Sequence, residues 1–189
     1  MTNTRSLRVV YMGTPDFAVP ALDALLESRH EVVAVVTNPD RESGRGKKVR
    51  FSPVKERAVA REVEVFQPLK VRGNQGAIDH IASYEPDVIV VAAYGQILPQ
   101  AVLDSAPMGS LNIHASLLPK YRGAAPIHWA IVRGETESGV TIMQMEAGLD
   151  TGPMLLAESV PIAPMDTAQI LHDKLSPVGA RLLLQALDG

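Results

Sequence analysis

The sequence predicts an α/β fold built on a mixed, mainly parallel sheet flanked by helices, and three observations support this class. Continuous apolar runs rich in Val and Ile recur along the first half, which is typical of parallel strands covered on both faces. Segments with helical spacing of apolar residues lie between these runs. In the second half, two apolar segments are joined by a short turn-rich stretch, which indicates an antiparallel pair.

The first half contains three predicted strands and two predicted helices. The strands are the runs "LRVVYM", "EVVAVVT" and "DVIVVAAY". Ala18, Leu22 and Leu25 share one helical face after a Thr-Pro start signal, and residues 78 to 84 form a second helix. Because a proline inside a helix removes a hydrogen bond, Pro20 predicts that residues 15 to 19 form a separate turn.

The second half contains the antiparallel pair and a long helix. The pair is "GVTIMQM" and "PMLLAESV", joined by "EAGLDTG". From Thr167 onward, apolar residues follow a helical spacing that predicts a helix packed on the sheet, with Pro177 breaking or kinking it. The chain shows no internal repeat or linker, so we expect one domain over residues 1 to 189.

Composition limits the classes of protein and of chemistry. The chain has 189 residues, 46% hydrophobic and 21% charged, which is typical of a folded soluble domain. It has no apolar run of about 20 residues, and the start "MTNTRSLR" lacks the apolar stretch of a secretory signal. We therefore expect a cytoplasmic location and no membrane contact. The absence of cysteine excludes disulfides, thiolate metal sites and cysteine nucleophiles.

Positive charge is concentrated in one segment. The net charge is -3, but the window from residue 41 to residue 57 holds seven basic and two acidic residues, so this window is strongly basic while the rest is acidic. Such segregation favours a local anionic partner. The alternative is a solvated loop with no ligand. Phe51, at the end of this loop, is expected in the core, although it could also stack on a base.

Several common sites are absent. Only Gly13 is present where a dinucleotide-binding protein carries three glycines, and "GRGKK" lacks the spacing of a nucleotide-binding P-loop. Ser116 is not in a nucleophile elbow. The histidines at positions 30, 80, 128 and 172 have no metal-binding spacing, so we expect no metal and assign them to the surface or to packing. Trp129 is expected to pack in a helix, and Met143 and Met145 to line the core or a pocket.

A candidate site follows from strand ends. In an open α/β sheet, ligands bind beyond the carboxyl ends of the strands, where "YGQILP" and "NIHASLLP" should lie close together. Asn112 and His114 are two residues apart on one strand, so their side chains project to the same side. An amine that attacks a carbonyl carbon needs hydrogen-bond donors and a proton acceptor. Asp150 could stabilise a charged His114 or order a water, although packing and turn roles remain open for all three residues.

These residues resemble a known family, the folate-dependent formyltransferases. The matching segments are "GTPDFAVPALDALL", "NPDRESGRGKKVRFSPVK", "AAYGQILP", "NIHASLLPKYRGAAPIHWAI" and "GVTIMQMEAGLDTGPML", which together extend from residue 7 to residue 156. The resemblance implies a Rossmann-like catalytic domain. The basic loop and "YRGAAPI" resemble the branch that formylates methionine esterified to initiator tRNA, for translation initiation.

The resemblance also implies roles for individual residues. Asn112, His114 and Asp150 would be the catalytic trio, acting on 10-formyltetrahydrofolate by direct transfer through a tetrahedral intermediate. Folate would contact Tyr94, Gly95, Gln96, Ile97, Leu98, Pro99, Ser116, Leu117, Leu118, Pro119, Glu146, Ala147 and Gly148. The acceptor stem of initiator methionyl-tRNA would contact residues 41 to 50, through Arg41, Arg45, Lys47, Lys48 and Arg50.

Two alternatives remain at this point, together with a question about length. The chain could formylate a small amine such as a nucleotide sugar, or it could be a non-catalytic RNA-binding module. The resemblance implies that tRNA enzymes of the family carry a second, carboxy-terminal barrel-like domain, which we expect to be absent from these 189 residues. We expect a monomer.

Overall fold

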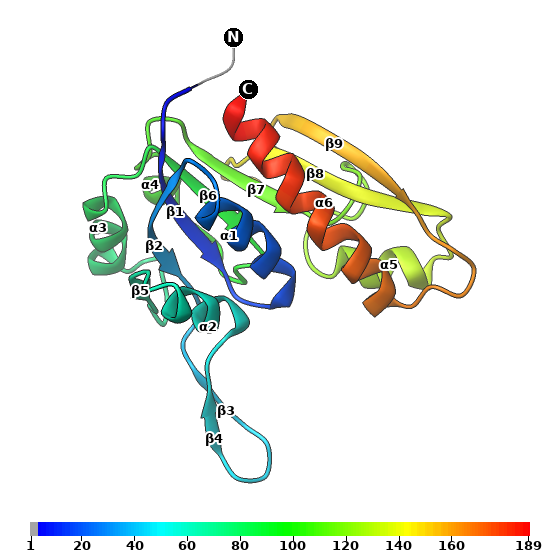
Figure 1. Cartoon of the computed structure of the whole chain (residues 1–189), viewed down its shortest axis with the longest axis horizontal. Coiled ribbons are helices and arrows are strands. Elements are labelled where there is room, and N and C mark those ends of the chain that lie inside the picture. Colours follow the sequence, from blue (N-terminus) through cyan, green and yellow to red (C-terminus); the bar gives the residue numbers. More distant parts are fainter. Residues whose placement is uncertain (1–3) are drawn as a thin grey trace.

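A seven-stranded sheet forms the centre of the computed structural model, which describes residues 4–189 (Figure 1). The first three residues, which belong to the segment read for a secretory signal, lie outside this range. The strand order is β5-β2-β1-β6-β7-β8-β9. The strands are β1 (Arg8–Gly13), β2 (Glu31–Val36), β5 (Val65–Phe66), β6 (Val88–Ala92), β7 (Ser110–His114), β8 (Glu137–Gln144) and β9 (Met154–Pro161). Neighbours from β5 to β7 pair in parallel, whereas β7–β8 and β8–β9 pair antiparallel, which confirms the predicted mixed sheet.

Helices cover both faces of the sheet. One face carries α1 (Val19–Leu26), α2 (Pro53–Ala60), α5 (Pro126–Val132) and α6 (Ala168–Asp188), and the other carries α3 (Gln75–Ser83) and α4 (Gln100–Leu103). Side chains alternate between the faces: Val9 and Tyr11 of β1 join the first core, and Val10 and Met12 join the second. Among residues 4–189, no helix combines the length and the apolar character that a membrane crossing requires.

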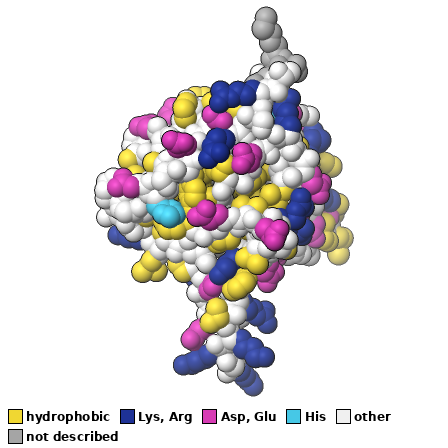
Figure 2. Space-filling model, turned by 60° about the vertical axis from the view of Figure 1, so that its left-hand side comes forward, with side chains coloured by type: hydrophobic (Ala, Val, Ile, Leu, Met, Phe, Trp, Pro, Cys, Tyr) yellow, Lys and Arg dark blue, Asp and Glu magenta, His cyan; other side chains and the backbone are white. Residues whose placement is uncertain are grey.

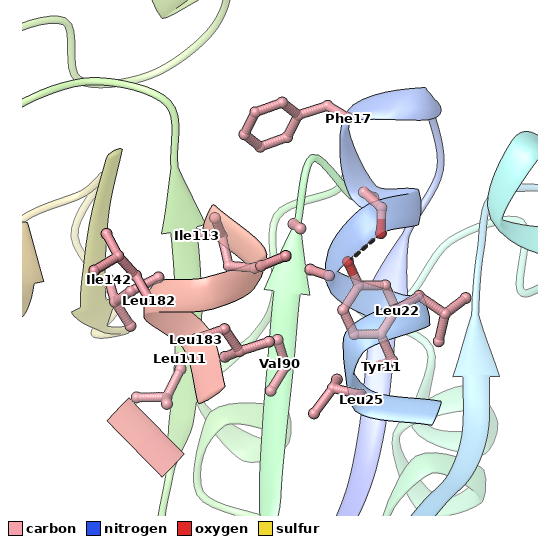
Figure 3. Close-up of a cluster of buried hydrophobic side chains, with 14 of the residues drawn as sticks. Tyr11, Phe17, Leu22, Leu25, Val90, Leu111, Ile113, Ile142, Leu182 and Leu183 are labelled. Atoms are coloured by element: carbon pink, nitrogen blue, oxygen red, sulfur yellow. Dashed lines mark hydrogen bonds between the residues drawn. The ribbon is translucent and has the colours of Figure 1, made fainter. Parts of the chain in front are cut away.

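The first core lies between the sheet and the helices α1 and α6 (Figure 3). Leu22 and Leu25 of α1 are fully buried there, which confirms the predicted helical face. The buried hydroxyl of Tyr11 donates a hydrogen bond of 2.5 Å to the carbonyl of Ala18. Burial strongly raises the pKa of Tyr11, so this hydroxyl stays protonated and keeps its hydrogen bond.

The two helix prolines behave differently. Residues Asp16–Ala18 form a separate 3₁₀ turn, η1, and Pro20 occupies the first turn of α1, where a backbone N–H has no partner within the helix. This confirms the predicted turn. Of the predicted break or kink at Pro177, the break is wrong, because α6 continues through the proline. Leu171 and Leu183 are buried on either side of the proline, so burial of the helix face offsets the missing hydrogen bond.

The basic segment is a hairpin and not an irregular loop. Strands β3 (Arg41–Ser43) and β4 (Lys48–Arg50) form a separate antiparallel pair that projects away from the main sheet (Figure 1). All residues of both strands are exposed. In Figure 2, the Lys and Arg side chains spread along both sides of this projection. We call residues 41 to 50 the basic hairpin.

Two aromatic side chains are partly exposed: Phe51, which was expected in the core, and Trp129, which was expected to pack in a helix. Phe51 is 43% exposed, because it follows β4 at the root of the basic hairpin and outside the main sheet. Trp129 is 49% exposed, because α5 directs Ala130 to the core and Trp129 lies on another side of that helix. The Arg133 guanidinium lies 5.7 Å from the centre of the Trp129 ring.

Candidate active site

The carboxyl end of β7 carries the first two predicted catalytic residues. Leu111 and Ile113 face the core under α6, so Asn112 and His114 project to the opposite side of the strand. Asn112 lies opposite Met143 of β8 and is partly buried, whereas His114 is buried. The alternation of side chains along a strand therefore places both side chains on one side, as predicted.

Asp150 joins these residues from the turn between β8 and β9. Its Oδ2 atom lies 3.6 Å from Nδ1 of His114, and its Oδ1 atom accepts a long hydrogen bond of 3.5 Å from Nδ2 of Asn112. The backbone N–H of Gly123 donates to Oδ2 at 2.7 Å and holds the carboxylate in place. The structure thus brings together three residues that are 38 positions apart at most.

A backbone carbonyl fixes the orientation of His114. Its Nε2 atom lies 2.8 Å from the carbonyl oxygen of Tyr121. Because a carbonyl only accepts hydrogen bonds, Nε2 carries the proton, and Nδ1 is the nitrogen that faces Asp150. A proton gained by His114 therefore lies on Nδ1, next to the carboxylate.

Tyr121 is itself held by Glu135. The Tyr121 hydroxyl donates a 2.6 Å hydrogen bond to Oε1 of Glu135, and this bond lowers the pKa of that carboxyl. Lys120 contacts the other carboxylate oxygen at 3.3 Å. Reasoning from the sequence did not identify Tyr121 or Gly123 as site residues, because their contributions are a carbonyl and an N–H that every residue has. Their only signal was the family-like segment "YRGAAPI".

Unusual backbone conformations gather around this site. Asp150 has a φ of 50°, and Ala93, Tyr121 and Ala125 also have positive φ values. Such values are uncommon outside glycine and cluster at functional sites. The turn also requires Gly152, because an added Cβ would lie 1.8 Å from the carbonyl oxygen of Gln144.

A cavity of about 730 Å³ opens beside the three residues. This volume is within the range of small-molecule sites, and most lining residues are apolar. Asn112, His114 and Asp150 all line it. A groove of about 700 Å³ between α1 and α6 is similar in size, but its lining includes none of Asn112, His114 and Asp150. Because three polar side chains converge on the cavity of about 730 Å³, we take that cavity as the candidate active site.

Most of the residues predicted to contact folate line this cavity. They are Tyr94, Gly95, Gln96, Ile97, Leu98, Glu146, Ala147 and Gly148. The Gln96 side chain is already engaged, since its Nε2 donates to Asn38 at 2.8 Å and its Oε1 accepts from the N–H of Val71 at 3.0 Å. Pro99 does not line the cavity and instead precedes α4 as its N-cap.

The cavity lining also leaves out Ser116, Leu117, Leu118 and Pro119, whose contact with folate stays a prediction. Thr141 of β8 anchors it: the Thr141 hydroxyl donates to the Ser116 carbonyl at 2.7 Å and accepts from the N–H of Leu118 at 3.2 Å. The Ser116 hydroxyl donates to the Lys120 carbonyl at 2.5 Å. These contacts fix the path of the chain toward Tyr121, and they leave the Ser116 hydroxyl already bonded.

Other lining residues were not predicted as site residues. They are Phe17, Val91, Ile127, His128 and Leu149, among others, whereas Met143 and Met145 line the cavity in agreement with their predicted core or pocket position. His128, expected at the surface or in packing, is exposed at the cavity.

The Tyr94 hydroxyl is buried without a hydrogen-bond partner among residues 4–189, and burial raises the pKa of Tyr94 to about 12. It therefore remains a protonated donor near neutral pH. Over the same residues, no group of three or more His, Asp or Glu side chains could hold a metal ion.

Comparison with known proteins places the chain in a family. It belongs to the formyl transferase family, whose model matches residues 7–187. The chain is similar to methionyl-tRNA formyltransferase from Trichlorobacter lovleyi, with 56% identity over 182 residues, which is 96% of this chain and 57% of that protein. It is 55% identical to the enzyme of that name from Caldanaerobacter subterraneus subsp. tengcongensis, over 96% of this chain and 59% of that protein.

The chain thus spans about three-fifths of the length of these curated relatives. The fold is also similar to solved structures. Glycinamide ribonucleotide transformylase 1 from Symbiobacterium toebii aligns with a TM-score of 0.81 at 22% identity, over 98% of this chain and 88% of that chain. At this identity the similarity concerns the fold.

Proposed function

We propose that residues 1 to 189 form the catalytic domain of an enzyme that transfers the formyl group of 10-formyltetrahydrofolate to the amino group of methionyl-initiator tRNA. The observation that carries the proposal is the contact among Asn112, His114 and Asp150 at the wall of a largely apolar cavity. The similarity to proteins named methionyl-tRNA formyltransferase supports the choice of acceptor. We further propose that the enzyme acts as a monomer in the cytoplasm.

The cavity suits a folate donor. Val91, Leu98 and Leu103 provide apolar walls for a flat ring system, and the exposed Glu146 provides a carboxylate at the margin. Because the Gln96 side chain is bonded within the protein, residues 94 to 98 would offer a ligand mainly their backbone groups and the apolar side chains. We therefore assign folate binding to Tyr94–Leu98 and Glu146–Gly148.

In direct transfer of the formyl group, the three polar residues would have different roles. The amine nitrogen forms a bond to the formyl carbon, and the carbonyl oxygen becomes an oxyanion. Asn112 Nδ2 and a protonated Nδ1 of His114 would stabilise this oxyanion by donating hydrogen bonds. When the bond from carbon to the folate nitrogen breaks, the proton released by the amine passes to that nitrogen. The Asp150 carboxylate, which lies 3.6 Å from Nδ1 of His114, would orient the ring during this exchange.

The basic hairpin would bind the acceptor stem. Arg41, Arg45, Lys47, Lys48 and Arg50 are exposed on it, and none forms an ion pair in the part of the chain that the structure describes. Five cations without partners on a narrow projection favour contact with phosphates over internal pairing.

The experiment is a formylation assay with the variant His114→Ala. We expect it to abolish transfer to methionyl-tRNA because it removes the donor to the oxyanion, while the melting temperature and the affinity for a stable 10-formyltetrahydrofolate analogue stay close to those of the unchanged protein. His80→Ala, on the distant helix α3, is the matched control. Normal turnover in His114→Ala would contradict the mechanism.

A second experiment tests the choice of acceptor. A nucleotide sugar is offered as a competing acceptor, and the products are identified by mass spectrometry.

A further inference from the structure

A second pocket lies between the basic hairpin and the catalytic cavity. It has a volume of about 510 Å³, and we call it the root pocket. Its walls come from the segments that follow three adjacent parallel strands, β2, β1 and β6. Ala93, Tyr94 and Gly95 line both the root pocket and the catalytic cavity. One extended substrate could therefore occupy both spaces across this shared wall.

Two arginines face each other at the mouth of the root pocket. Arg41 and Arg50 are cross-strand partners at the base of the hairpin, and both line the pocket. Like charges directly opposite on neighbouring strands are destabilising. Asp16 is the one acidic residue in the lining. Two cations against one anion leave net positive charge, which favours a ligand that carries phosphate.

The root pocket also presents an aromatic ring. Phe51 lines it and is 43% exposed. The Lys55 ammonium lies 3.8 Å from the centre of the Phe51 ring, so one face of the ring is fixed by a cation. An exposed ring held in place is a suitable platform for a nucleobase, because stacking needs a flat apolar surface and no particular hydrogen-bond pattern.

Lys55 contacts Phe51, which follows β4, and also Asp40, which precedes β3 at the other end of the hairpin. Its Nζ atom forms a 2.7 Å ion pair with Oδ2 of Asp40, and the other oxygen of Asp40 accepts from Gln67 at 2.8 Å. Asp40 precedes β3 and Phe51 follows β4. Lys55, in α2, therefore holds both ends of the hairpin and helps to position Phe51 and the two arginines relative to the sheet.

We propose that the root pocket binds an unpaired nucleotide at the 3′ end of the acceptor strand, with its base stacked on Phe51 and its phosphate between Arg41 and Arg50. This inference rests on the proposed function. The esterified methionine would then cross the wall formed by Ala93–Gly95 toward Asn112 and His114, while the paired part of the stem contacts the tip of the basic hairpin.

The test compares two acceptors in the formyl transfer assay, methionyl-tRNA and methionine methyl ester, which has no nucleotide. We expect Phe51→Ala to lower kcat/KM for methionyl-tRNA about tenfold more than for the methyl ester, since stacking on an aromatic ring contributes roughly this much per base. Phe51→Trp should restore the value because it keeps the platform. Val59→Ala is the control, since Val59 is similarly exposed at 50% and lies on α2 outside the pocket. Equal decreases with both acceptors, or no decrease with tRNA, would overturn the proposal.

A binding measurement separates this inference from the proposed function. If the unchanged protein formylates neither acceptor, the proposed function fails. Fluorescence anisotropy with a labelled single-stranded RNA of sequence ACCA then decides on the pocket. We expect Phe51→Ala and Arg50→Gln each to weaken binding about tenfold, and only Arg50→Gln to reduce its dependence on salt. Unchanged affinity in both variants would refute the root pocket as a nucleotide site.

Discussion

At the scale of single residues, main-chain groups orient the side chains that we propose to be catalytic. The Tyr121 carbonyl places the proton of His114 on Nε2, and the Gly123 N–H holds the Asp150 carboxylate. His114 thus has one nitrogen committed to the protein and one facing Asp150. In the proposed mechanism the side chains supply the chemistry, and these backbone contacts leave Nδ1 of His114 as the nitrogen that faces Asp150.

This arrangement predicts a specific effect of Asp150→Asn. The amide oxygen of Asn can still accept from Gly123, so we expect the turn and the melting temperature to be retained. The charge opposite His114 Nδ1 is removed, so kcat for formyl transfer should fall about 100-fold or more. Steady-state kinetics and thermal unfolding measure the two properties. The control is Asp104→Asn, at the exposed end of α4. A variant with normal kcat would show that the carboxylate charge is dispensable.

Asp40 is one carboxyl whose protonation should lower the stability of the protein at acid pH. Hydrogen bonds from Lys55 and Gln67 hold its pKa below the usual value. A carboxyl whose pKa is lowered by folding contributes stability above its unfolded pKa of about 3.9, and this contribution is lost as the pH falls through the folded pKa. We therefore expect Asp40→Asn to lower the melting temperature at pH 7, with a smaller difference from the unchanged protein below about pH 4.

Melting temperatures between pH 7 and pH 3 check this prediction, with Asp79→Asn on the surface of α3 as the control. A constant difference at every pH would mean that the carboxylate charge of Asp40 contributes no stability.

At the scale of elements, the strands and their turns carry the residues of the site, and a helix packs against these strands. Strand β7 carries Asn112 and His114, and the turn from β8 to β9 carries Asp150. The helix α6 packs against α1, β8 and β9, and so covers the strands on which the site is built. The same helix contains Pro177, which costs it one backbone hydrogen bond without ending it.

Pro177→Ala should therefore stabilise the protein. Alanine restores a helix donor and has a higher helix propensity than proline, which outweighs the greater freedom that alanine gives the unfolded chain. We expect the free energy of unfolding to rise by about 1 to 2 kcal/mol in urea titrations. Pro53→Ala, at the start of α2, is the matched control and should bring no gain, because proline is favourable there. A decrease in stability in Pro177→Ala would show that α6 is built around the proline ring.

At the scale of the whole molecule, charge is divided between the hairpin and the main sheet. The net charge of the chain is -3, although the window from Arg41 to Arg57 has seven basic residues and two acidic ones. Figure 2 shows acidic and basic side chains mixed over the body, whereas Lys and Arg predominate on the projection. Attraction to a nucleic acid should therefore act mainly through the hairpin, while the acidic body repels it elsewhere.

The salt dependence of kcat/KM for methionyl-tRNA tests this division. We expect the triple variant Arg45→Gln, Lys47→Gln and Lys48→Gln to lower kcat/KM at low salt and to make the logarithmic slope against salt shallower. The change in slope should reach up to about 0.9 for each phosphate that the variant no longer neutralises. The control replaces Arg61, Lys70 and Arg72 with Gln, three exposed cations outside the hairpin. Equal slopes for both triple variants would contradict a hairpin-centred interaction.

The periodic elements could be predicted from the sequence because their signals are local. Buried Val and Ile runs indicated the strands, and the spacing of Asn112 and His114 placed them on one side of β7. The break expected at Pro177 and the core position expected for Phe51 were wrong, because packing holds α6 together through the proline and because Phe51 lies at the root of the hairpin, outside the main sheet. The family resemblance added the roles, which spacing left open.

By itself, the sequence determined the α/β class, the mixed sheet, the exclusion of cysteine chemistry and the concentration of positive charge in one segment, because composition and periodicity are properties of the chain. Only the tertiary structure decided that Tyr121 and Gly123 hold the trio, that Ser116–Pro119 support the site without lining it, and that Lys55 clamps the hairpin over a second pocket. These features depend on backbone groups and on contacts between distant segments, and neither has a signature in the identity of the residues.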